Sequence, residues 1–169
     1  MNKKITLYNV MFPLWMLVLF PQTWIFVIPI NFLVDSLVIL ITGKIRKLKN
    51  VMECYKKSIL KSFLFGFVAD FIGGFVMFLP EILPHEWFTN PILKNIRSSI
   101  MANPFTNIFS LMYVLLAIIV SMFFIYNLNL KYVFKKLDID EKDKKVLALV
   151  MMFVTAPYTF LVPTTWLYY

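Results

Sequence analysis

Two acidic residues stand inside long apolar stretches and are the residues best placed to do chemistry. Asp70 is the one charged residue between Ser62 and Leu79, and Asp35 interrupts the apolar run from Ile25 to Thr42. A carboxylate at membrane depth costs several kcal/mol unless it is neutral, paired, or facing water or the interior of a helical bundle. If the two helices are neighbours, the two carboxyl groups can approach one another, and such a pair can bind a proton or a small cation.

The two acids lie at similar depths along their helices. Asp35 is seven residues from Thr42, and Asp70 is nine residues from Lys61. At about 1.5 Å per residue these counts place them roughly 10 and 14 Å into the membrane. We expect Asp70, set among Gly and Phe, to be uncharged at rest, because no local donor offsets its desolvation. Asp35 has the Asn31 amide one turn away and is expected to ionise first.

Further polar residues are candidates for binding an ion or a substrate. Asn31 shares a stripe with Asp35, and Ser110 belongs to a stripe of small and polar residues in a later span. Thr155 and Tyr158 flank Pro157, which removes a backbone donor and frees the carbonyl of Phe153. The candidate binding residues are therefore Asp35, Asp70, Asn31, Ser110, Thr155 and Tyr158.

Small residues recur around Asp70 at helical spacing and predict a groove where another helix approaches. The expected packing residues are Gly66, Gly73, Gly74 and, in the later stripe, Ser121. Gly66 and Gly74 are expected to face a neighbouring span. The opposite side of the same helix is bulky enough to meet lipid, with Phe65, Phe67, Val68, Phe71, Ile72 and Phe75.

Composition places these residues in a membrane. The 169-residue chain is 60% hydrophobic, and its mean hydropathy is +0.77, which predicts an all-α integral membrane protein. One cysteine excludes an intrachain disulfide and a CxxC redox pair. The net charge of +8 comes from basic residues that flank the apolar spans, so we expect contact with the lipid bilayer and not with nucleic acid. Lysine outnumbers arginine 15 to 2, and Ile, Phe and Asn are abundant, which is the residue usage expected from an AT-rich genome and favours a bacterial plasma membrane.

Hydropathy and proline positions predict five transmembrane helices in one domain, residues 1–169. The first is short and interrupted by proline, and the spans are Ile5–Phe20, Trp24–Thr42, Ser62–Leu79, Phe105–Tyr126 and Val146–Val162. Gly43 is expected to end the second span and Pro80 the third. The stretch Ile45–Lys61 is amphipathic and is predicted to lie along the membrane surface. Glu81–Pro104 is predicted to be a polar loop, and Lys131–Lys145 a charged connector.

Signatures of enzymes and metal sites are incomplete. His85-Glu86 begins like a zinc helix, but Thr89 stands where the second histidine is required. The acids from Asp138 to Asp143 have no loop glycine and no later glutamate, which excludes an EF-hand. We therefore predict no catalytic residue, no metal and no cofactor.

These features favour a transporter, or a transporter subunit, that handles a cation or a small solute through Asp35 and Asp70. A chain of this size is expected to work as a homo-oligomer or within a larger membrane complex. The alternative is a non-catalytic accessory, assembly or immunity protein in which the acids only lock helix packing. A membrane enzyme acting on a lipid-borne substrate is the third possibility.

The distribution of Lys and Arg predicts that the N-terminus is cytoplasmic and the C-terminus outside. Fifteen basic residues fall on one side of the five spans and two on the other, and the basic side faces the cytoplasm. An alkaline phosphatase fused at Asn90 should be active, and one fused at Asp140 inactive. The reverse result at either site would overturn this topology.

Overall fold

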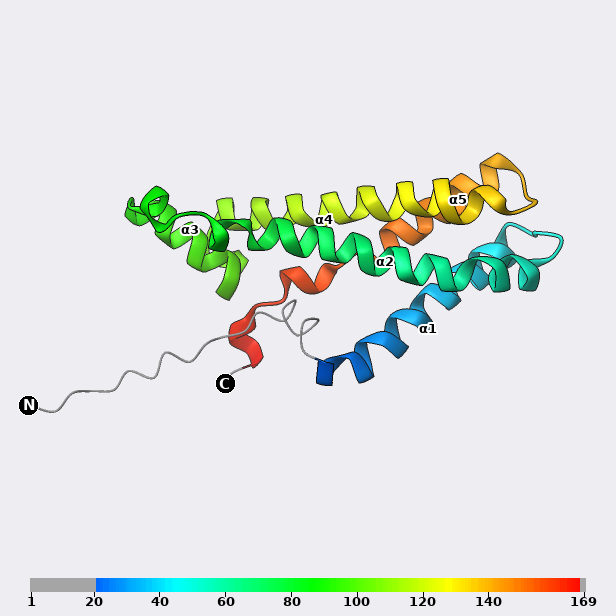
Figure 1. Ribbon diagram of the computed structural model, residues 1–169, viewed down its shortest axis with the longest axis horizontal. Helices are drawn as coiled ribbons and strands as arrows, with labels where there is room; N and C mark the ends of the chain where they lie inside the picture. Colours follow the sequence, from blue (N-terminus) through cyan, green and yellow to red (C-terminus); the bar gives the residue numbers. More distant parts are fainter. Residues whose placement is uncertain (1–20, 168–169) are drawn as a thin grey trace, which may run out of the picture.

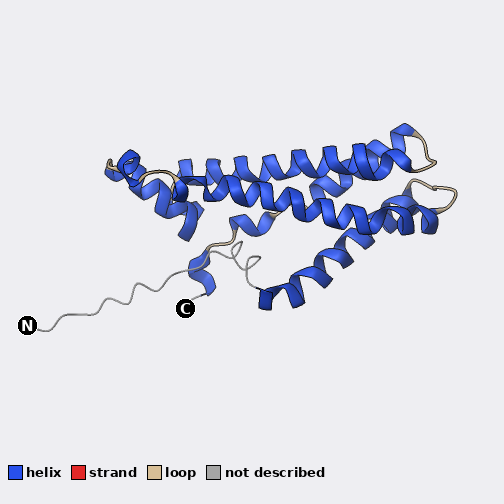
Figure 2. Ribbon diagram, viewed as in Figure 1, coloured by secondary structure: helices blue, strands red, loops and turns tan. Residues whose placement is uncertain are grey.

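The computed structural model describes residues 21–167, and every regular element in this range is a helix or a helical turn (Figures 1 and 2). Four helical segments are long and apolar enough to cross a membrane, namely Ile25–Ile45, Val51–Ile82, Ile108–Lys136 and Glu141–Leu161. The chain is an all-α membrane protein, as predicted from its composition. The predicted first span, Ile5–Phe20, lies outside the described residues.

Helices α2 (Val51–Ile82) and α4 (Ile108–Leu128) run side by side in opposite directions and form the long axis of the bundle (Figure 1). Helices α1 (Pro21–Ile45) and α5 (Glu141–Val154) pack against this pair. The C-terminal half of α1 is held in the core, whereas its N-terminal half diverges from the bundle (Figure 1). Ile39 is 1% exposed and Ile25 is 71% exposed.

The core consists of two clusters of buried apolar side chains. The first lies at the basic end of the bundle, by which we mean the end formed by the α1–α2 turn and the α4–α5 connector, and it includes Ile39, Phe134 and Leu147. The second lies further along α2 and α4 and includes Met77 and Val114. At the basic end, Arg46 Nε donates to Asp143 Oδ1 at 2.7 Å, which ties the end of α1 to the start of α5.

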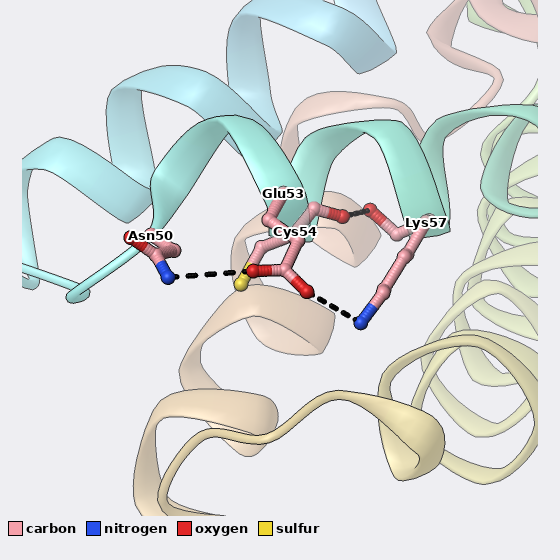
Figure 3. A network of polar contacts seen from close by, with 5 residues as sticks. Asn50, Glu53, Cys54 and Lys57 are labelled. Carbon is pink, nitrogen blue, oxygen red and sulfur yellow. Dashed lines mark hydrogen bonds and ion pairs between the residues drawn. The ribbon is translucent and has the colours of Figure 1, made fainter.

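The amphipathic stretch Ile45–Lys61 does not form a separate surface helix. From Val51 onward it is the beginning of α2, which continues without a break to Ile82. Figure 3 shows the first turns, where Glu53 accepts from Asn50 Nδ2 at 3.3 Å and from Lys57 Nζ at 2.6 Å. Cys54 of this segment is buried in the first core cluster. Ile59 of the predicted apolar face is also buried in this cluster, whereas Met52 is exposed.

Pro80 does not end the helix in which it lies. It occupies the last turn of α2, and the helix reaches Ile82. A proline has no N–H to donate to the carbonyl four residues earlier, here that of Val76. The hydroxyl of Tyr113 in α4 donates to this carbonyl instead, at 2.6 Å. The cost of an unpaired carbonyl at membrane depth is thereby avoided.

The predicted polar loop Glu81–Pro104 is folded. It contains a 3-10 turn, His85–Phe88, and the twelve-residue helix α3, Pro91–Ala102. Asn90 caps α3 by accepting from the amide of Ile92 at 2.9 Å, and Pro91 occupies the first helical position, where no donor is needed. Arg97 of α3 is buried and paired with Glu81 at 2.7 Å. The prolines that indicated a loop instead mark the start of a helix.

Gly43 lies inside α1, which ends at Ile45. Leu48 N donates to the Gly43 carbonyl at 3.1 Å, and Lys47 adopts a positive φ of 54°. This is a Schellman-type ending with lysine at the position where glycine is usual. A Cβ on Gly43 would come within 2.9 Å of Val51, so this glycine serves the close turn into α2.

Gly73 and Gly74 have different surroundings. A Cβ added to Gly73 would lie 1.8 Å from Ser121 Oγ and 3.1 Å from the Ala117 carbonyl oxygen, both in α4. A Cβ added to Gly74 meets no atom of the described chain within 4 Å. Gly74 was expected to face a neighbouring helix, and within residues 21–167 it does not. The α2–α4 contact depends on Gly73 because the helices leave no space for a methyl group there.

We expect Gly73→Ala to destabilise the protein by about 1 to 3 kcal/mol, the usual range for overpacking. Gly74→Ala is the matched control and should leave the melting temperature in detergent unchanged or slightly higher, because a helical alanine replaces a glycine in open space. Adding Ser121→Gly should restore part of the stability lost in Gly73→Ala. Equal melting temperatures for the two alanine variants would contradict this packing.

Candidate functional site

Asp35 of α1 and Asp70 of α2 line the same cavity. Gly66 lies on α2 one turn before Asp70 and lines the same cavity. A Cβ added to Gly66 would be 3.9 Å from Asp35 Oδ2. The structure therefore brings together the two acids that the sequence placed at similar depths.

The cavity has a volume of about 150 Å³ and is built from three helices. Its lining residues are Asn31, Val34 and Asp35 from α1, Phe63, Gly66, Phe67 and Asp70 from α2, and Val154, Thr155 and Ala156 from the end of α5. Among residues 21–167, this lining contains two acids and no lysine, arginine or histidine. Within that part of the chain, a cation in the cavity would meet no basic side chain in its lining.

Helix α5 ends at the cavity. It has regular structure only to Val154, and Thr155 to Pro157 are non-helical before a 3-10 turn at Tyr158–Leu161. The predicted span Val146–Val162 is thus helical in its first part only, because Pro157 cannot continue the hydrogen-bond ladder. Val154 is nine residues after Lys145, or roughly 14 Å. This is the depth that the sequence indicates for Asp70, so α5 unwinds at the level of the acids.

Neither acid has a hydrogen-bond or ion-pair partner among residues 21–167. Asp35 is 5% exposed, and no donor reaches its carboxyl group. Asp70 Oδ1 is fully buried without a partner. Asn31 was expected to donate to Asp35. It lines the cavity, but within the described chain its amide makes no hydrogen bond to the Asp35 carboxyl group. The carboxyl groups thus retain acceptor capacity that the surrounding protein does not use.

Thr155 also lines the cavity and is oriented by its own backbone. Its hydroxyl donates to the Met151 carbonyl at 2.8 Å. The hydroxyl proton is used in this bond, and the lone pairs of the oxygen remain available to accept. A threonine in this state is an acceptor. Of the four oxygen-bearing side chains that line the cavity, those of Asp35, Asp70 and Thr155 therefore offer only acceptors when the acids are ionised, and Asn31 carries both a carbonyl oxygen and an NH2 donor.

Two other candidate residues have different partners. Ser110 Oγ donates to the Ile96 carbonyl at 2.9 Å and joins α4 to α3, away from the acids. Tyr158 Oη donates to the Phe153 carbonyl at 2.7 Å. That carbonyl was expected to be freed by Pro157, and Tyr158 occupies it. Neither residue lines the cavity.

Sequence reasoning assigned Phe67 to the lipid-facing side of its helix, but it lines the cavity together with Phe63. The two rings meet edge to face, with centroids 4.9 Å apart. Ser62 and Asn129 were also missed as a pair, and their side chains hydrogen-bond in the buried interior between α2 and the turn that follows α4. Asn129 is fully buried at the start of a π-helical turn, Asn129–Val133, a local irregularity that hydropathy does not reveal.

No protein-family model, curated protein or solved structure matches the chain.

Proposed function

We propose that the chain binds a proton or a small monovalent cation at Asp35 and Asp70 and carries it across, or couples it to movement within, the membrane. The observation that supports this is the pair of carboxyl groups from separate helices in one cavity, with no donor or counter-ion among residues 21–167. An ionised carboxylate in this position costs several kcal/mol. The site is stabilised only when a proton or a cation occupies it.

The break in α5 supports the same proposal. Non-helical backbone at membrane depth is tolerated where it is buried in protein or lines a cavity. In transporters, the ends of discontinuous helices contribute to cation sites near the middle of the bilayer. Here Thr155 and Ala156 follow the last residue of α5 and line the cavity that holds the acids.

The competing role for the acids is to lock helix packing. A packing acid would donate or accept a hydrogen bond across the helix interface, as Ser62 and Asn129 do. Asp35 and Asp70 make no such bond in the described chain, which favours binding over packing. The proposed setting is a bacterial plasma membrane, where the chain works as a homo-oligomer or as a subunit of a larger transporter.

Carbodiimide labelling in native membranes tests whether Asp70 holds a proton, because the reagent attacks protonated carboxyl groups in apolar surroundings. We expect a mass increase on the peptide that contains Asp70. Asp138, which is exposed in the charged connector, is the matched control and should remain unlabelled. Failure to label Asp70 in a folded protein, when a carbodiimide of this type labels another membrane carboxyl in the same preparation, would contradict the proposal.

The variant Asp70→Asn separates binding from packing. An amide has nearly the shape of a protonated carboxyl group, so the elution profile and melting temperature in detergent should stay close to those of the wild type. Cation movement into proteoliposomes, followed with a pH-sensitive or sodium-sensitive dye, should be lost. A variant that moves the cation as the wild type does would leave the acids with a packing role only.

A further inference from the structure

The cavity has an aromatic wall that a site for a proton or a bare metal ion does not need. Phe63 and Phe67 stand edge to face at an interplanar angle of 85°. Phe32 of α1 meets Phe63 in the same way, with centroids 5.5 Å apart at 79°. Phe32 connects α1 to this pair, and of the three rings Phe63 and Phe67 line the cavity that holds the carboxyl groups.

The polar groups of the cavity are mainly acceptors. Asp35 and Asp70 have unused carboxyl oxygens, and the hydroxyl proton of Thr155 is committed to Met151. A ligand that matches this surplus must bring several donors. A protonated primary amine has three N–H donors and a positive charge.

The same lining is poor for a divalent metal ion. Calcium takes six to eight oxygen ligands and magnesium six, and the cavity offers two carboxyl groups, one amide and one hydroxyl among five apolar side chains and a glycine. Its volume of about 150 Å³ also exceeds that of an ion, because cavities of about this volume admit benzene. The apolar part of the cavity is therefore matched to carbon atoms of a ligand.

We infer that the cavity binds a small primary alkylammonium ion, with the ammonium group between Asp35 and Asp70 and the alkyl chain against Phe67 and Val34. This inference rests on the proposed function and names the class of cation. The ammonium group donates to both carboxyl groups and to the Thr155 oxygen. One positive charge balances one ionised carboxylate, while the second carboxyl keeps its proton. The ring of Phe67 contributes by burying part of the alkyl chain.

Calorimetric titration of the purified full chain in detergent, at fixed neutral pH, compares three probes, namely n-butylammonium, tetramethylammonium and sodium. We expect n-butylammonium to bind about tenfold or more tightly than tetramethylammonium, which has no N–H donor for the carboxyl groups. Asp70→Asn should lower the affinity for n-butylammonium by about tenfold or more. Phe67→Leu should weaken this binding by about three- to tenfold, because less apolar surface covers the alkyl chain, and Phe75→Leu, an exposed control on the same helix, should not change it.

The outcomes separate this inference from the proposed function. Binding of sodium, with no heat from either ammonium ion, would overturn the inference and leave a cation site. Equal affinity for the two ammonium ions, or an affinity for n-butylammonium that Asp70→Asn leaves unchanged, would also overturn it. Loss of both carbodiimide labelling at Asp70 and all cation binding would overturn the proposed function as well. The comparison of the three probes uses the wild-type protein, so it tests the inference even if a variant fails to fold.

Discussion

The need to satisfy polar groups away from water is the constraint on which this bundle depends. An unpaired polar group in hydrocarbon costs several kcal/mol, and most of the chain shows how that cost is avoided. Tyr113 and Tyr158 donate to the two carbonyls that Pro80 and Pro157 leave without an amide partner. The side chains of three asparagines accept from backbone amides at the starts of helical segments, namely Asn90, Asn103 and Asn107. Against this background, the two carboxyl groups have no partner in the described chain, and the buried hydroxyl of Ser121 also has none. The carboxyl groups differ from that hydroxyl because they line a cavity, and exceptions to polar satisfaction are expected at functional sites.

The rest of the architecture sets the distance between the two acids. The close contact of Gly73 with α4 fixes α2 against its neighbour. At the basic end, the ion pair between Arg46 and Asp143 ties the helix that carries Asp35 to the helix whose end lines the cavity. Apolar clusters lie on either side of the acids, since Ala69 belongs to one and Met77 to the other. The cavity thus lies where the two clusters meet, and the helix break of α5 closes one wall of it.

Sequence patterns predict the parts of this fold that depend on local composition. The depths of Asp35 and Asp70 follow from counting along uncharged runs, and the fourth span was predicted to within three residues at each end as α4. Sequence patterns fail where contacts between residues distant in sequence determine where a helix begins, where it ends and which side chains face the cavity. Prolines read as loop markers begin α3, because Pro91 needs no amide donor at that position. Pro80 is tolerated within α2 because Tyr113, distant in sequence, takes over the freed carbonyl. The position of Phe67 at the cavity depends on the angle between α1 and α2, which no periodicity encodes.

Proximity of Asp35 and Asp70 is the central claim, and cross-linking measures it most directly. In a Cys54→Ser background, the double replacement Asp35→Cys with Asp70→Cys would be treated with dibromobimane, which becomes fluorescent only after it joins two thiols. We predict strong fluorescence on the monomeric chain. The pair Asp35→Cys with Phe71→Cys is the matched control at the same depth, because Phe71 is 49% exposed and does not line the cavity. Equal fluorescence from the two pairs, or none from the pair at 35 and 70 when both thiols react with a monofunctional maleimide, would contradict the account.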